Sequence, residues 1–165
     1  MPLVVSNTSP IVNLAAIGQL SLLQQLYGRL FIPEEVFVEI VLRGAGQPGS
    51  AEVQTYSWFE RRQVTNTSLL RRIIQQHPLL DQGEAEAIVL ALELGAERIL
   101  LDETEGRAAA IRMGLLVTGV LGTLKEAKQR NLIPAVKPLM DDLIQIAGFW
   151  IDNVLYLRVL RDVGE

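Results

Sequence analysis

Residues 80–102 read LDQGEAEAIVLALELGAERILLD and contain the pattern of a helix followed by a strand. Asp81 is suited to cap the start of the helix, and Gly95 is suited to the turn that ends it. The next apolar run, Arg98–Leu101, is short and bounded by charged residues, which is typical of a buried strand, and Asp102 follows it. A helix joined to a buried strand in this way favours an α/β fold with a parallel sheet.

The same alternation of short apolar runs and amphipathic segments extends through the chain. Strands are predicted at Leu3–Ser6, Arg29–Ile32, Trp58–Thr65, Arg98–Leu101 and Leu115–Thr118. The helices predicted are Ser9–Gly18 (Pro10 at its first helical position), Ser21–Tyr27, Glu34–Arg43, Ala51–Ser57, Ser68–His77, Gln82–Leu94, Thr104–Met113, Leu121–Arg130, Pro134–Ala147 and Ile151–Asp162. Parallel strands need long crossovers, so we expect a mostly parallel sheet covered on both faces, with ligands beyond the carboxyl ends of its strands.

Composition restricts the chemistry that the chain can support. Its 165 residues predict a single domain over residues 1–165. The absence of cysteine and the single histidine, His77, exclude thiolate and multi-histidine metal sites, so the side-chain donors must be oxygen atoms. A net charge of −4 argues against coating nucleic acid by bulk electrostatics. The N-terminal residues lack the pattern of a leader, and no long apolar run follows, so we expect a cytoplasmic protein with no membrane partner.

Glu84 is unusual because it lies on the apolar face of its predicted helix. At about 100° per residue it aligns with Ile88 and Ala91 and therefore points into the fold. A buried carboxylate requires a metal ion or protein donors. The spacing of Asp81 and Glu84 also fits a capping box, in which Glu84 would bind the backbone of Asp81. The sequence leaves both interpretations open.

Three acids follow the strand Arg98–Leu101 within four positions, namely Asp102, Glu103 and Glu105. Their charges repel one another unless a cation lies among them, and either a metal ion or Arg107 could supply that charge. The spacing of Asp102 and Glu105 is also typical of a helix cap.

Glu39, in the predicted helix Glu34–Arg43, is either a surface partner of Arg43 or a ligand. Asn7 follows the first predicted strand and brings a further oxygen donor. Hard oxygen donors at several separated points of the chain suit Mg²⁺ or Mn²⁺.

Four segments together resemble the PIN-domain family, in particular a prokaryotic PIN-like subgroup related to VapC-type toxins. They are VSNTSPI (5–11), IPEEVFVE (32–39), LDQGEAEAI (80–88) and LDETEGR (101–107). The resemblance implies a three-layer α/β/α fold with a mostly parallel central sheet. It also implies a Mg²⁺- or Mn²⁺-dependent ribonuclease, with RNA as substrate and, in a toxin–antitoxin pair, an antitoxin protein as partner.

The resemblance also assigns roles to individual residues. The implied metal ligands are Asn7, Glu39, Glu84, Asp102 and Glu105; the implied catalytic carboxylates are Glu39, Glu84 and Asp102; the implied supporting residues are Thr8, Ser9, Glu103 and Arg107. PIN nucleases usually carry aspartate where this chain has Asn7. An amide oxygen can coordinate a cation but brings no negative charge, so we expect weaker metal binding and weaker activity.

Two other functions are compatible with the sequence. One is a catalytically weak or inactive PIN-like module that binds RNA or protein. The other is a nucleotide-binding fold in which Gly119–Gly122 forms a phosphate cradle before a helix. The aromatic residues Phe149, Trp150 and Tyr156 belong either to the core or to a homodimer contact or antitoxin groove.

Overall fold

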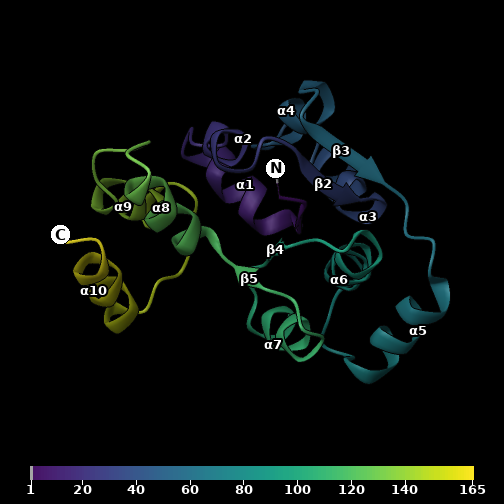
Figure 1. Ribbon diagram of the computed structural model, residues 1–165. Coiled ribbons are helices and arrows are strands. Elements are labelled where there is room, and N and C mark those ends of the chain that lie inside the picture. The colour runs from purple at the N-terminus through teal and green to yellow at the C-terminus, as the bar shows by residue number, and fades with distance from the viewer. Residues whose placement is uncertain (1) are drawn as a thin grey trace.

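The computed structural model describes residues 2–165, and Figure 1 shows a parallel sheet between two layers of helices. Within this range five strands pair in the order β3-β2-β1-β4-β5, and every pairing is parallel. The strands are β1 (Val4–Ser6), β2 (Leu30–Pro33), β3 (Phe59–Arg62), β4 (Arg98–Leu100) and β5 (Val117–Thr118). The predicted three-layer α/β/α fold is therefore confirmed.

Alternating side chains of the strands serve two separate cores. Val4 belongs to the core on one face, while its neighbour Val5 belongs to the core on the other. The first face carries α1 (Thr8–Ala16), α2 (Ser21–Tyr27), α8 (Val120–Gln129), α9 (Lys137–Gln145) and α10 (Asn153–Asp162). The second carries α5 (Thr67–Gln76), α6 (Gln82–Leu94) and α7 (Thr104–Arg112). No helix of residues 2–165 is long and apolar enough to cross a membrane.

The chain after β2 departs from the predicted single helix. It forms α3 (Glu34–Phe37) and then η1 (Val38–Arg43), a π-helical segment with wider turns, before α4 (Ser50–Thr55). Because side chains in a wider turn are separated by a smaller angle, the face predicted for an α-helix is not preserved after Phe37.

Helix ends also differ from the prediction at α1 and α10. Helix α1 begins at Thr8 rather than Pro10, because the chain turns into it directly after β1, and Pro10 lies in the first turn, where a backbone N–H needs no helical partner. Helix α10 begins at Asn153 rather than Ile151, because the Asp152 side chain accepts from the Val154 N–H at 3.1 Å and caps the helix there.

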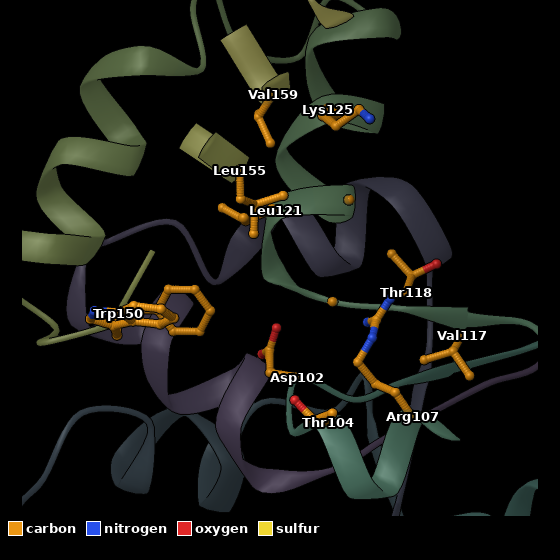
Figure 2. A pocket seen from close by; sticks show the side chains of 13 residues that line it. Asp102, Thr104, Arg107, Val117, Thr118, Leu121, Lys125, Trp150, Leu155 and Val159 are labelled. Carbon is orange, nitrogen blue, oxygen red and sulfur yellow. The ribbon is translucent and has the colours of Figure 1, made fainter. Parts of the chain in front are cut away.

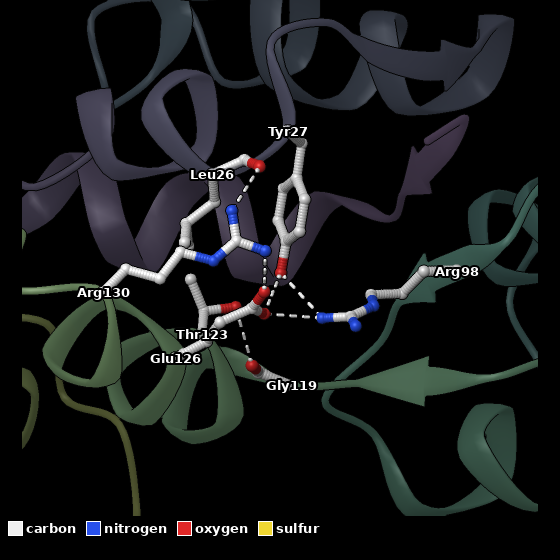
Figure 3. Close-up of polar contacts among 7 residues, drawn as sticks. All are labelled: Leu26, Tyr27, Arg98, Gly119, Thr123, Glu126 and Arg130. Carbon is white, nitrogen blue, oxygen red and sulfur yellow. Dashed lines mark hydrogen bonds and ion pairs between the residues drawn. The ribbon is translucent and has the colours of Figure 1, made fainter. Parts of the chain in front are cut away.

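A polar network fixes α8 against the rest of the fold (Figure 3). The Glu126 carboxylate accepts hydrogen bonds from Arg98, at the start of β4, at 2.6 Å and from the Tyr27 hydroxyl, at the end of α2, at 3.2 Å. Arg98 also donates to the Tyr27 oxygen at 3.1 Å. The network orients α8 so that its N-terminus lies at the carboxyl edge of the sheet.

Candidate active site

The strand order creates a crevice at the carboxyl ends of β1 and β4. From β1 the chain adds β2 and β3 on one side and then returns to add β4 and β5 on the other, which is the point where open α/β sheets bind ligands. Asn7 directly follows β1, and its backbone N–H donates to the Leu100 oxygen at 3.0 Å. Asp102 follows β4 by two residues. Two of the predicted site residues therefore share this edge.

Asn7 and Glu39 both lie against Gly83, at the start of α6. The Asn7 amide nitrogen donates to Glu103 Oε2 at 3.3 Å, and Asn7 Oδ1 is buried without a hydrogen-bond partner among residues 2–165. The Thr8 hydroxyl donates to Glu39 Oε2. A Cβ atom on Gly83 would lie 2.7 Å from Glu39 Oε1 and 3.4 Å from Asn7 Oδ1. Two segments distant in the chain thus bring oxygen atoms to one glycine of a third segment.

The surface interpretation of Glu39 is wrong, because Arg43 pairs with Glu35 instead, at 2.7 Å. Glu39 lies in η1, and its carboxylate is bound by Thr8 at the start of α1 rather than by Arg43. Burial raises the pKa of Glu39, the hydrogen bond from Thr8 lowers it, and the charge of Asp81 raises it. The carboxylate is therefore held where its charge is poorly solvated.

Glu84 forms the predicted capping box and is also buried, as its place on the apolar face predicted. The Asp81 N–H donates to Glu84 Oε2 at 2.8 Å, and the Glu84 N–H donates to Asp81 Oδ1 at 2.8 Å, which forms the capping box. The residue is only 4% exposed, and a Cβ on Gly106 would lie 3.1 Å from its Oε1. Burial raises the pKa of Glu84 to about 7, and the charges of Asp81, Glu103 and Glu39 act in the same direction. Its carboxyl group is therefore divided between both protonation states near neutral pH.

Asp102 is held at the N-terminus of α8. Its Oδ1 accepts from the Val120 N–H at 2.9 Å, while its Oδ2 is buried without a partner among the described residues. Burial raises the pKa of Asp102 to about 6, with the Glu103 charge raising it further and Arg107 lowering it. A Cβ on Gly119 would lie 2.6 Å from Asp102 Oδ1, so this position accommodates only glycine without movement of the carboxylate.

This arrangement contradicts the phosphate cradle predicted at Gly119–Gly122. Gly119 is the N-cap of α8 and Gly122 lies inside the helix. The Val120 N–H, which a phosphate would need, donates to Asp102. A carboxylate of the chain itself takes the place of the anion.

Three glycines that make room for the carboxylates were not among the predicted site residues. The pairs are Gly83 with Glu39, Gly106 with Glu84 and Gly119 with Asp102. The available signal was glycine in the first turns of two helices, where it is otherwise unfavourable. Sequence analysis also gave no sign that Glu86 is buried, where it accepts from the Glu35 N–H at 3.2 Å.

Of the remaining predicted site residues, Arg107 lies at this edge of the sheet and Glu105 lies away from it. Arg107 donates to the Leu101 oxygen at 2.8 Å and lies beside Asp102, and the Ser9 hydroxyl accepts a hydrogen bond within α1. Glu105 is exposed and lines a separate hollow with residues 76–80, so the structure does not bring it to the other acids. Within residues 2–165, no three acidic or histidine side chains lie close enough together to form a metal site.

The side-chain oxygen atoms at this edge are nevertheless of the kind that binds a hard cation such as Mg²⁺. Asn7 Oδ1 and Asp102 Oδ2 are buried oxygen atoms that lack partners in the described part of the chain. Glu39 and Glu84 add carboxylates whose negative charge is destabilised by burial. Buried oxygen donors of this kind favour a divalent cation.

The fold and this edge define an α/β protein with a carboxylate site at the switch point of a parallel sheet. The chain matches the family model DUF3368, a PIN domain, over residues 3–165. The protein therefore belongs to the PIN-domain family, which has a nuclease-type fold, and the family resemblance is confirmed. The relation to VapC-type toxins stays a prediction. A search of curated proteins finds no match.

Proposed function

We propose that this protein is a Mg²⁺- or Mn²⁺-dependent endoribonuclease that hydrolyses phosphodiester bonds in RNA. The observation that carries the proposal is that Asn7 and Asp102 follow the adjacent strands β1 and β4, and that each has a buried side-chain oxygen without a partner among residues 2–165. The carboxylate of Glu39 lies beside Asn7 at Gly83, and Glu84 adds a buried carboxylate in the same helix as Gly83. Membership of the PIN-domain family supports the same chemistry.

The residues proposed to hold the cation are Asn7, through Oδ1, and the carboxylates of Glu39, Glu84 and Asp102. When bound, a divalent cation supplies stabilisation of charge on phosphate oxygens and orients a water molecule. Glu105 is not part of this set, because it lines a different hollow.

The chain's own groups hold the proposed donors in place. Thr8 directs one oxygen of Glu39, and Glu103 binds the Asn7 nitrogen so that the Asn7 oxygen faces Gly83. The Asp81 N–H binds Glu84 Oε2 at 2.8 Å, which leaves Glu84 Oε1 available to the cation.

A second candidate is a catalytically weak or inactive module that binds RNA or protein at the same edge. Two observations favour it. Asn7 is neutral where the family usually has a carboxylate, and no three acids in residues 2–165 already form a metal site.

The resemblance to VapC-type toxins extends the proposal to a cellular role. In that role a single-domain cytoplasmic toxin would be neutralised by an antitoxin protein and could act as a homodimer. Expression in bacteria should then arrest growth, and the double substitution Glu84→Gln with Asp102→Asn should restore it.

The direct test is cleavage of labelled RNA by the purified protein with Mg²⁺ or Mn²⁺. Glu84→Gln and Asp102→Asn should each lower the rate by about 100-fold or more, since each removes a charged group from the reacting site. Glu97→Gln is the matched control, because Glu97 is exposed at the opposite edge of the sheet. Circular dichroism and melting curves verify folding.

Three outcomes separate the candidates. Metal-dependent cleavage that the two variants lose supports the nuclease. A wild-type protein that is inert toward several RNAs with both metals contradicts it, and RNA binding that persists in EDTA and in the variants then supports the module. Asn7→Asp adds a fourth carboxylate and should raise both the affinity for Mn²⁺ and the rate of the nuclease.

A further inference from the structure

A cavity of about 490 Å³ adjoins the proposed site on the side of the C-terminal segment. Figure 2 shows Asp102 and Thr104 facing it from the sheet edge, Trp150 across from them, and Leu121 and Leu155 above. Its size falls within the range of small-molecule pockets, and one wall is polar while the other is apolar. Such a cavity suits a ligand that has both an aromatic and a charged part.

Trp150 is the unexpected part of this cavity. It is 83% exposed, so the interpretation of this residue as core is wrong. The other tryptophan, Trp58, is 9% exposed and stacks on Phe59 with 4.0 Å between ring centroids. An exposed indole costs free energy in water, and its flat face at the mouth of a cavity suits the stacking of a planar ring.

Arg107 supplies the charged part of the cavity. It donates to the Leu101 oxygen at 2.8 Å and forms no ion pair within residues 2–165. By contrast, Lys125, which also lines the cavity, is bound to Asp162 at 2.9 Å. Since a guanidinium group has five N–H donors, Arg107 retains donors for an anion, and phosphate fits its fork geometry.

The combination favours a nucleotide over an apolar peptide. A peptide side chain could cover Trp150, but it would offer no anion to the donors that Arg107 retains beside Asp102. A nucleotide presents a planar base for Trp150, a phosphate for Arg107 and ribose hydroxyl groups for Thr104 or Thr118.

We propose that this cavity binds one nucleotide of an RNA strand next to the bond that is cleaved, with its base on Trp150 and its phosphate on Arg107. The inference rests on the proposed function, since it assigns the cavity to the same substrate. Trp150 and Arg107 are then binding residues that set the position of the strand relative to Asp102.

The test measures binding without cleavage, in EDTA. In a Trp58→Phe background Trp150 is the only tryptophan, and a short single-stranded oligoribonucleotide should quench its fluorescence saturably. In anisotropy assays with a labelled oligoribonucleotide, Trp150→Ala should weaken binding by about tenfold and Trp150→Tyr should retain most of it, because stacking depends on an aromatic face. Arg107→Gln should weaken binding and reduce its dependence on salt.

Leu157→Ala is the matched control, since Leu157 is an exposed apolar side chain of α10 that does not line the cavity. Equal affinity of the wild type, Trp150→Ala and Arg107→Gln overturns the subsite even if the protein cleaves RNA. Quenching by an apolar peptide but not by RNA also overturns it, as does quenching by adenosine monophosphate but not by the oligoribonucleotide. Binding that depends on both residues in a protein that never cleaves RNA supports the subsite and contradicts the nuclease.

Discussion

The two ends of strand β4 differ in how their charged side chains are paired. At its start, Arg98 and Arg130 both bind Glu126, which also accepts from the Tyr27 hydroxyl (Figure 3). Beyond its end, Asp102 Oδ2 is buried without a partner among residues 2–165, and the charge of Glu103 adds to the burial that raises the pKa of Asp102.

This difference distinguishes the charges at the start of β4, which stabilise the fold, from the acids beyond its end, which are proposed to bind a cation. Paired charges with several hydrogen bonds contribute to stability, whereas clustered carboxylates of like sign lower it. A chain retains the second arrangement when the site has another use, and groups with shifted pKa values are concentrated at such sites. The comparison predicts that loss of charge costs stability at the start of β4, whereas ionisation of the acids costs stability beyond its end.

The largest expected effect on stability is at the start of β4. Glu126→Gln removes the negative charge that Arg98 and Arg130 share, and we expect a loss of about 1–3 kcal/mol in the free energy of unfolding. Urea denaturation measures it. Glu60→Gln, at a surface pair with Arg29, is the control and should cost about 0–1 kcal/mol. Equal losses at both positions would show that the Glu126 network contributes no more than a surface pair.

The pH dependence of stability tests the other end of the strand. The pKa of Glu84 is about 7 in the folded protein against an ordinary value of 4.5, and that of Asp102 is about 6 against 3.8. The folded state therefore binds these protons more tightly than the unfolded state. The contribution to stability is complete below the ordinary values and is lost as the pH rises to about 7.

In EDTA, the melting temperature should consequently fall as the pH rises from about 5 to 7.5, and the fall should be smaller in Glu84→Gln, which cannot ionise. Thermal denaturation in a series of buffers measures this slope. A slope that is the same in the variant and the wild type would contradict the effect assigned to Glu84.

The smallest effect on stability is expected for Gly83→Ala. The new Cβ would lie 2.7 Å from Glu39 Oε1, which can move because it is the end of a flexible side chain. Alanine favours a helix over glycine by about 1 kcal/mol, so the free energy of unfolding should change by less than about 1 kcal/mol. RNA cleavage should nevertheless fall by about tenfold, since displacement of a positioned group slows the reaction.

A double-mutant cycle with Glu39→Gln identifies the cause of that loss. If Gly83→Ala acts through Glu39, it should have little further effect on cleavage once Glu39 is replaced. Additive losses would instead indicate a separate effect on α6.

Local patterns predicted most of the fold. The cap at Asp81, the apolar face of Ile88 and the end at Gly95 define α6 within the sequence itself, and α6 appears with the predicted bounds. Patterns failed where a distant residue competes with a local one. Glu39 is bound by Thr8, 31 residues away in the chain, and Arg43 pairs with Glu35 instead. Nothing in the local periodicity indicates this contact or the π-helical segment after Phe37.

Sequence patterns also identified the oxygen donors of the candidate site. The four donors could be selected because each one breaks a local rule or matches a family segment, as Glu84 does on its apolar face. Their actual neighbours could not be selected. Thr8 beside Glu39 and Glu103 beside Asn7 depend on which strands are adjacent, as does the exposure of Trp150.

The sequence by itself determined the order of helices and strands, the family, and the oxygen donors available to a site, because periodicity, capping and composition act over a few neighbouring residues. Only the tertiary structure decided which donors share an edge, which of their atoms lack partners and which aromatic ring faces water. These properties depend on burial and on contacts between segments far apart in the chain, and burial is a property of the folded molecule as a whole.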